Sequence, residues 1–386
     1  MYSLLLAIIY LAFISLGLPD SLLGSAWPVM HTAFQVPISY MGIITMLISG
    51  CTVLSSLLSD FLTKKLKNPA VVIISALMTC LALFGFSRAT AFWMLVVLAV
   101  PYGLGAGSVD AALNNYVATH YSAKHMSWLH CFWGVGAIIS PFVMGYALTH
   151  SHWNNGYLTI SAVQGFIGLV LLLSLPLWKV NKEKAVSTQP EKSIGLVGAL
   201  KIKGVPFLLL GFFCYCAAEF AALEWASTYL VQARKLPEEM AATFGSLFFI
   251  GMTVGRFFGG FIMDRFGDRK MIRMGAAISI LGMFLLWLPV QTNVFSLMAF
   301  VIIGLGFAPI YPCIIHSTPS NFGAENSGAI IGIQMASAYA GATFMPPIYG
   351  LLGKAIGFEI MPFYLLIFIG LMLFMVEKTF RITKNS

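Results

Sequence analysis

Long apolar stretches alternate with short polar segments along the whole chain. About 20 consecutive, predominantly apolar residues are enough to cross a bilayer as a helix. The pattern predicts twelve such helices, with limits near 4–30, 38–60, 70–88, 91–117, 127–149, 156–178, 205–231, 240–263, 270–290, 294–316, 327–352 and 359–377. The longest connection is polar and lysine-rich, so we expect six helices in residues 1–178, a cytoplasmic linker in 179–204 and six helices in 205–386.

Composition supports an all-α integral membrane protein. Of the 386 residues, 59% are hydrophobic and 9% are charged, whereas a soluble domain carries about 25% charged residues. The net charge of +8 does not indicate nucleic-acid binding, because the basic residues lie mostly in short loops. The six cysteines fall in apolar runs without metal-ligand spacing, so we expect neither a metal site nor a cofactor.

The distribution of Lys and Arg predicts the orientation in the membrane. If both termini are cytoplasmic, 17 of the 22 basic residues lie on the cytoplasmic side and only 4 on the opposite side. This asymmetry follows the positive-inside rule. We therefore expect a multi-pass protein of the cell membrane (the inner membrane in a bacterium), with both termini cytoplasmic.

Similar residues recur at nearly constant spacing in the two halves. Asp20 matches Glu224 and Asp60 matches Asp264, each at a spacing of 204 residues. Gly103-Leu104-Gly105 matches Gly304-Leu305-Gly306 at a spacing of 201 residues. Pro141 and Gly145 match Pro346 and Gly350 at a spacing of 205 residues. Four matches across a central polar segment indicate a duplicated unit. The expected architecture is two pseudo-symmetric six-helix bundles.

The loop after the eighth predicted helix carries a specific motif. Residues 259–270 read GGFIMDRFGDRK, and the motif positions are Gly260, Asp264, Arg265, Gly267, Arg269 and Lys270. Gly267 permits a tight turn, and Asp264 at a helix end can pair with basic residues and cap a neighbouring helix. The equivalent loop at 59–69, SDFLTKKLKNP, keeps Asp60 but lacks the glycines. The motif resembles the loop signature of the major facilitator superfamily, which implies transport by alternating access.

Polar residues interrupt the predicted fourth helix. Asp110 and Asn114 are four residues apart and therefore share a helix face, and Asn115 follows directly. Gly103 and Gly107 extend that face as a small-residue stripe, which allows close approach of a helix or a ligand. An Asp at the centre of a membrane helix costs roughly 2.5–3.5 kcal/mol on insertion scales. We therefore expect Asp110 and the two asparagines to face a cavity, a partner or a proton path.

Two further carboxylates are candidates for proton coupling and substrate binding. Asp20 follows Pro19, which permits a helix break beside the acid; the alternative is a buried residue bonded to backbone that the proline frees. Glu224 shares its face with Ser227 and Thr228, a polar stripe suited to a cavity. Glu219 lies on a more apolar face, and its role stays open.

Histidine, aromatic and amide side chains complete the candidate site. His130 is expected to couple to Asp110 through a proton, or else to form a static hydrogen bond with it. Trp133 is the expected stacking surface for an apolar sugar face. Tyr311 and Gln334 are the candidates in the second half, and the role of His316 stays open. Pro309 and Pro312 predict a distorted tenth helix. Arg256 is expected to be structural, either by snorkelling or as part of the cytoplasmic charges.

The central stretch also resembles the fucose–galactose–glucose:proton symporter family. The similarity rests on Gly-Leu-Gly at 103–105, Asp110 with Ala111-Ala112 and Asn114, His130, the GVGAII run at 134–139, and Asp20. It implies proton symport of a monosaccharide, a hexose, bound at Asp20, Asn114, Asn115, His130, Trp133, Glu224, Tyr311 and Gln334. This chain departs from the family in carrying Asp110 where Glu is common and His130 where a glutamine is found.

Two other transport functions remain open. A proton-driven drug or lipid exporter often carries Gly-Pro in its fifth helix, but here Ser140 precedes Pro141. A sodium-coupled sugar symporter differs only in the coupling ion. An enzyme is not expected, because no Ser/His/Asp spacing or metal motif is present. The expected partners are a small-molecule substrate and the lipid bilayer, with no nucleic acid, and the protein is expected to act as a monomer.

Overall fold

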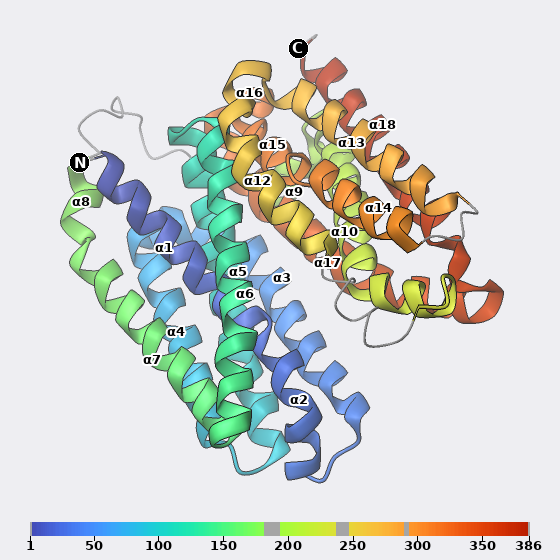
Figure 1. The fold of residues 1–386 in the computed structure, drawn as a ribbon. Coiled ribbons are helices and arrows are strands. Elements are labelled where there is room, and N and C mark those ends of the chain that lie inside the picture. The colour runs from blue at the N-terminus through green and yellow to red at the C-terminus, as the bar shows by residue number, and fades with distance from the viewer. Residues whose placement is uncertain (1, 181–193, 237–246, 289–292, 385–386) are drawn as a thin grey trace. The chain divides into compact units, whose positions relative to one another are not determined.

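The computed structural model describes residues 2–180, 194–236, 247–288 and 293–384. Every regular element in these ranges is a helix (Figure 1). Twelve helices in them are long and apolar enough to cross a membrane, which confirms the predicted number. The predicted start of the eighth helix near residue 240, the end of the ninth and most of the 179–204 linker lie outside the described residues.

The chain forms two compact units. The first comprises Met1–Tyr116 with Phe132–Gly195, and the second comprises Val117–Cys131 with Leu196–Ser386. Two helices, α5 (Phe92–His120) and α6 (Ala123–His150), therefore contribute residues to both units. The division into bundles at 1–178 and 205–386 stays a prediction.

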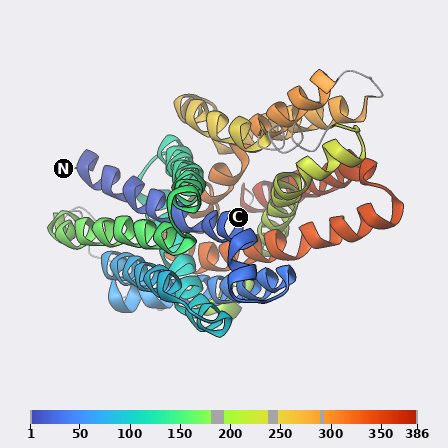
Figure 2. The same cartoon turned by 60° about the horizontal axis from the view of Figure 1, so that its bottom comes forward.

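In the first unit, the remaining helices are α1 (Tyr2–Asp20), α2 (Leu22–Ala33), α3 (Met41–Leu66), α4 (Asn68–Arg88), α7 (Trp153–Leu173) and α8 (Leu175–Val180), with a 3-10 turn at Ile38–Tyr40. α4 packs along α7, and α1 contacts both (Figures 1 and 2). The apolar N-terminal span is broken after Asp20, as Pro19 predicts.

Glycines on α5 allow the close helix packing that their spacing predicts. A Cβ on Gly103 would lie closer to the Ile48 carbonyl oxygen than van der Waals contact allows. A Cβ on Gly107 would clash in the same way with the carbonyl oxygen of Thr52. The hydroxyl of Thr52 in turn donates to the Gly103 carbonyl at 3.2 Å. The small-residue stripe therefore receives another helix, α3, at backbone contact distance.

In the second unit, the remaining helices are α9 (Gly195–Lys201), α10 (Val205–Gln232), α12 (Leu247–Phe266), α13 (Asp268–Trp287), α14 (Asn293–Phe307), α15 (Ile310–His316), α16 (Thr318–Phe322), α17 (Ala324–Ile356) and α18 (Met361–Lys384), with a 3-10 turn at Phe358–Ile360. α10 packs along α17 and α18, while α14 packs on α12 and α13. The tenth span is split between Phe307 and Ile310, beside Pro309, which confirms the predicted distortion.

Candidate functional site

Asp20 ends α1 and is held by side chains from two other helices of the first unit. The indole Nε1 of Trp133 on α6 donates to Asp20 Oδ2 at 2.9 Å, and the hydroxyl of Tyr102 on α5 donates to Oδ1 at 3.4 Å. Asp20 itself is exposed. The hydrogen bonds of Asp20 are thus made to side chains of two other helices, and its role as a proton or substrate site stays a prediction. Three helices converge on this carboxylate.

Asp110 and Asn114 form a buried pair in the same unit. Asn114 Nδ2 donates to Asp110 Oδ1 at 2.8 Å, and the two residues are 4% and 0% exposed. The bond confirms that they share a face of α5. Asn115, one position further along the helix, is half-buried and points in a different direction. The pair places a carboxylate and an amide side by side on one face of α5.

His130 lies in the second unit, buried against an aromatic cluster. Its ring centroid is 4.6 Å from that of Tyr311, at an interplanar angle of 72°. Tyr311 also packs 4.6 Å from Phe212, and its hydroxyl donates to Met335 Sδ at 3.4 Å. Tyr311 and His130, two of the predicted site residues, are thus brought together. The coupling of His130 to Asp110, which belongs to the first unit, stays a prediction.

Glu219 and Arg256 form a buried ion pair in the second unit. Arg256 Nη2 lies 3.1 Å from Glu219 Oε1, and the residues are 3% and 4% exposed. Arg256 therefore does not snorkel, and its buried ion pair is consistent with the expected structural role. A charged side chain inside the membrane is stabilised by an opposite charge at contact distance. Glu219 on α10 supplies that charge for Arg256 on α12. The hydroxyl of Ser127 donates to the Arg256 carbonyl at 2.6 Å, which fixes this part of α12.

Glu224 and Gln334 occupy different environments on α10 and α17. Glu224 is exposed, and Ser227 and Thr228 beside it are half-buried, so the polar face predicted for this helix is accessible. Gln334 is fully buried, and its Oε1 accepts the Thr318 hydroxyl at 3.0 Å. Glu224 is therefore exposed on α10, whereas Gln334 connects α16 and α17.

The motif residue Asp264 binds the start of α6. Its Oδ1 accepts the backbone N–H of Lys124 at 3.2 Å, and its Oδ2 accepts the Ser122 hydroxyl at 3.0 Å. Lys124 Nζ lies 3.8 Å from the same carboxylate. Gly267, three residues later, has φ +76°, the conformation that a glycine adopts without strain. The predicted cap and turn are both confirmed.

The rest of the motif joins α13 to neighbouring helices. Arg269 and Arg273 both hold Glu377 of α18, at 2.6 and 2.5 Å. His316 Nδ1 lies 2.8 Å from Asp268 Oδ2, and its Nε2 lies 3.2 Å from the Tyr121 carbonyl oxygen. His316 thus belongs to this charged region. Gly260 is buried, whereas Arg265 and Lys270 are exposed at the ends of α12 and α13.

The first-half loop does not repeat this arrangement. Lys67, with φ +70°, takes the turn position that Gly267 holds in the second half. Asp60 lies seven residues before Lys67, whereas Asp264 lies three residues before Gly267. Asp60 is therefore about one helical turn further from its turn, where it pairs with Lys64 of the same helix at 3.1 Å. The constant spacing of Asp60 and Asp264 in sequence does not make them equivalent in structure.

Sequence reasoning missed three contacts in these clusters. Tyr102 directly precedes the Gly103-Leu104-Gly105 run and could have been noticed there. Glu377 is an acidic residue at the end of the last predicted helix, and a basic partner for it could have been predicted. Arg256 could have been assigned a buried acid on an adjacent helix. Among the residues that the structure describes, no group of three or more His, Cys, Asp or Glu side chains could hold a metal ion.

Comparison with known proteins identifies the family. The model of the Major Facilitator Superfamily matches residues 9–342 and 241–384. Bypass of stop codon protein 6 of Saccharomyces cerevisiae is 21% identical, over 95% of this chain and 80% of its own length. The glucose/mannose transporter GlcP of Bacillus subtilis is also 21% identical, over 78% of this chain and 77% of its own.

A solved structure shares the fold. The fucose:proton symporter FucP of E. coli superposes with a TM-score of 0.79 at 17% identity, covering 98% of both chains. The family match, the twelve spanning helices and this likeness agree. The chain therefore belongs to the major facilitator superfamily, and it is a multi-pass membrane transporter of small molecules rather than an enzyme.

Proposed function

We propose that this transporter moves a monosaccharide, most simply a hexose, together with a proton by alternating access. The observation that carries the proposal is the Asp20 carboxylate, which is exposed and is held at 2.9 Å by the indole N–H of Trp133. Sugars need carboxylate or amide groups for their hydroxyls and an aromatic ring for their apolar face. Asp20 and Trp133 supply both groups side by side.

The proton would be carried by carboxylates of the same unit. Asp110 is buried and accepts a hydrogen bond from the amide of Asn114, and burial in an apolar interior favours uptake of a proton by a carboxylate. We infer that protonated Asp110 favours sugar binding and that loss of the proton favours release. Glu224 is the corresponding exposed acid of the second unit. We further propose that His130, which packs on Tyr311, responds to the uptake and loss of this proton.

The remaining features of the proposal follow from the sequence and the relatives. The printed names of two similar proteins, a glucose/mannose transporter and a fucose:proton symporter, support a sugar substrate. We further propose both termini in the cytoplasm, a location in the cell membrane, a monomeric working unit and no cofactor. The motif of α12 and α13 would hold one conformation through Asp264 and release it in the other.

Uptake into proteoliposomes tests the proposal. The purified full-length protein is reconstituted, an inward proton gradient is imposed, and accumulation of labelled hexoses is measured. We expect accumulation that follows the proton gradient and is abolished by a protonophore. Competition by unlabelled sugars then identifies the substrate. The matched control is Glu359→Gln, which neutralises an exposed acid in the 3-10 turn before α18.

Two results would replace the proposal with its alternatives. Accumulation that requires a sodium gradient and ignores the proton gradient would assign sodium as the coupling ion. Absence of hexose uptake, together with counterflow of an amphipathic drug or a lipid, would assign an exporter.

A further inference from the structure

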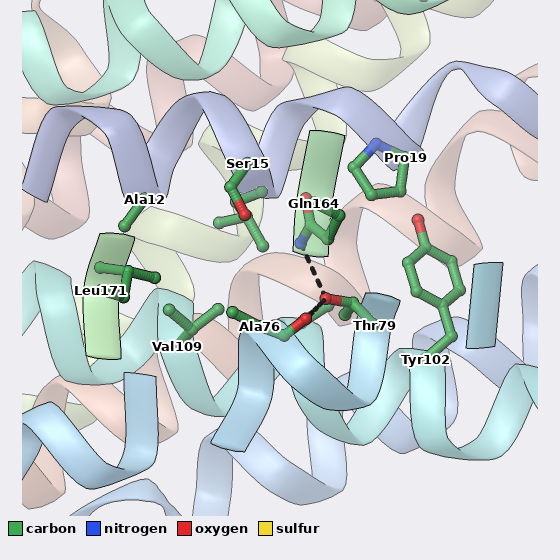
Figure 3. Close-up of a pocket in the computed structure, with 11 residues that line it drawn as sticks. Ala12, Ser15, Pro19, Ala76, Thr79, Tyr102, Val109, Gln164 and Leu171 are labelled. Atoms are coloured by element: carbon green, nitrogen blue, oxygen red, sulfur yellow. Dashed lines mark hydrogen bonds between the residues drawn. The ribbon is translucent and has the colours of Figure 1, made fainter. Parts of the chain in front are cut away.

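A small cavity lies inside the first unit, between α1, α4, α5 and α7. Figure 3 shows the side chains around it, with Gln164 of α7 and Ser15 of α1 on one side and Tyr102 of α5 beside Pro19. The cavity offers about 10 Å³ to the centre of a water molecule. That is room for about one water and far too little for a sugar.

The amide of Gln164 has one satisfied end and one unsatisfied end. Its Nε2 donates to the Thr79 hydroxyl oxygen at 2.8 Å, whereas its buried Oε1 has no hydrogen-bond partner. The residue is 2% exposed. A buried acceptor without a partner loses its hydration free energy without compensation. A hydrogen-bond donor in the cavity would therefore stabilise this oxygen.

The hydrogen bonds of Thr79 favour this orientation of the Gln164 amide. Thr79 donates its only hydroxyl hydrogen to backbone carbonyls of its own helix, to Ser75 at 3.1 Å or Ala76 at 3.0 Å. In this arrangement its oxygen accepts from Gln164 Nε2. Gln164 Oε1 is then the end of the amide that is left for a partner in the cavity.

Further acceptors border the same space. Pro19 has no N–H, so it supplies no intrahelical donor to the carbonyl of Ser15, four residues earlier. The Ser15 side chain also lines the cavity and is buried. Tyr102 uses its hydroxyl hydrogen for Asp20, which leaves its oxygen able to accept. The Ser15 hydroxyl can donate as well as accept, but the other polar groups named here present acceptors to the cavity, and a molecule with two donors suits them.

We propose that this cavity binds one water molecule, which donates to Gln164 Oε1 and to the Tyr102 hydroxyl oxygen. The water connects α7 to Asp20 through Tyr102. Hydrogen bonds in such a chain polarise one another, so the water strengthens the bond from Tyr102 to the Asp20 carboxylate. Gln164 is then a positioning residue for Asp20. This last consequence rests on the proposed role of Asp20, whereas the water site does not.

The site is tested first without any transport assay. A crystal structure of the purified wild-type protein, at a resolution that shows other buried waters, is expected to show one water within hydrogen-bond distance of Gln164 Oε1. Absence of density there would overturn the proposal. Crystals in which thallium replaces sodium provide the second arm, because an anomalous peak in the cavity would assign a monovalent cation instead of water.

The link to Asp20 is tested by Gln164→Leu, with Ser161→Ala as the matched control. Ser161 lies on the same helix and donates to the Cys80 carbonyl of α4, away from the cavity. In the Gln164 variant we expect the pH profile of substrate counterflow to move to higher pH by about half a unit, because the bond from Tyr102 to Asp20 is weakened but not lost. The control is expected to keep the wild-type profile.

The outcomes separate the inference from the proposed function. A lower rate with an unchanged pH profile in Gln164→Leu would assign Gln164 a structural role only and overturn the link. If no substrate is transported at all, the proposed function fails, and the wild-type crystal structure still decides whether the water site exists.

Discussion

The guanidinium of Arg256 lies 3.1 Å from the carboxylate of Glu219, and both side chains are buried in the second unit. Two charges removed from water in this way stabilise one another only as long as both are present. The pair lies on two different helices, α12 and α10. It therefore fixes how these helices pack, and single substitutions should reveal this dependence.

The first prediction concerns the loss of one partner. Arg256→Met should destabilise the protein by roughly 3–5 kcal/mol, because it leaves the Glu219 carboxylate buried without its counter-charge. The double variant Glu219→Gln with Arg256→Met should recover most of this loss. Thermal unfolding of the purified variants in detergent measures both effects. A double variant no more stable than the single variant would mean that the pair is not the stabilising interaction.

The second prediction concerns the cap that Asp264 provides for α6. Asp264→Ala should cost about 1 kcal/mol of stability, because the Lys124 N–H loses its acceptor. Asp264→Asn keeps an acceptor and should lose less. Lys124→Met serves as the control, since it removes only a half-exposed ion pair worth about 1 kcal/mol or less. Equal unfolding temperatures for Asp264→Ala and the wild type would contradict the capping role.

Local sequence patterns predicted the features that depend on neighbouring residues. The helix breaks beside Pro19 and Pro309 follow from the missing N–H of proline. The contact between Asp110 and Asn114 follows from the helical period. In each case the cause lies within one turn of helix, so the sequence alone contained it.

Pairings between distant segments could not be predicted in the same way. Glu219 and Arg256 are 37 residues apart, and Arg269 and Glu377 are 108 apart. Their contact depends on the rotation of each helix about its axis, which packing decides. For Asp60 the sequence suggested an equivalence that the structure does not show. Asp60 and Asp264 keep the spacing of the repeat, but Asp60 lies about one helical turn further from the loop that follows it.

The third prediction concerns the indole that holds Asp20. Trp133→Phe keeps an aromatic ring but removes the N–H that donates to Asp20 Oδ2. A hydrogen bond to a charged group contributes about 1.5–3 kcal/mol, so the KM for the transported sugar should rise about tenfold or more.

The control for this substitution lies on the same helix. Trp128→Phe also removes an indole N–H, which donates to the Phe257 carbonyl at 3.1 Å. It should leave KM unchanged. An equal rise of KM in both variants would mean that the effect comes from α6 as a whole and not from Asp20.

The fourth prediction concerns energy coupling through Asp110. Asp110→Asn keeps an oxygen that can accept from Asn114 Nδ2, so the buried contact and the packing of α5 should survive. The amide cannot take up and release a proton. The variant should therefore lose accumulation against a gradient while it retains exchange of labelled for unlabelled substrate.

Uptake and counterflow in the same proteoliposomes separate these two activities. Glu359→Gln, which neutralises an exposed acid at a helix end, should retain both. Accumulation retained by Asp110→Asn would remove Asp110 as the proton carrier and leave Asp20 and Glu224 as the remaining acids to test. Loss of exchange as well as accumulation would instead place Asp110 in substrate binding, because exchange needs a bound substrate but no net movement of protons.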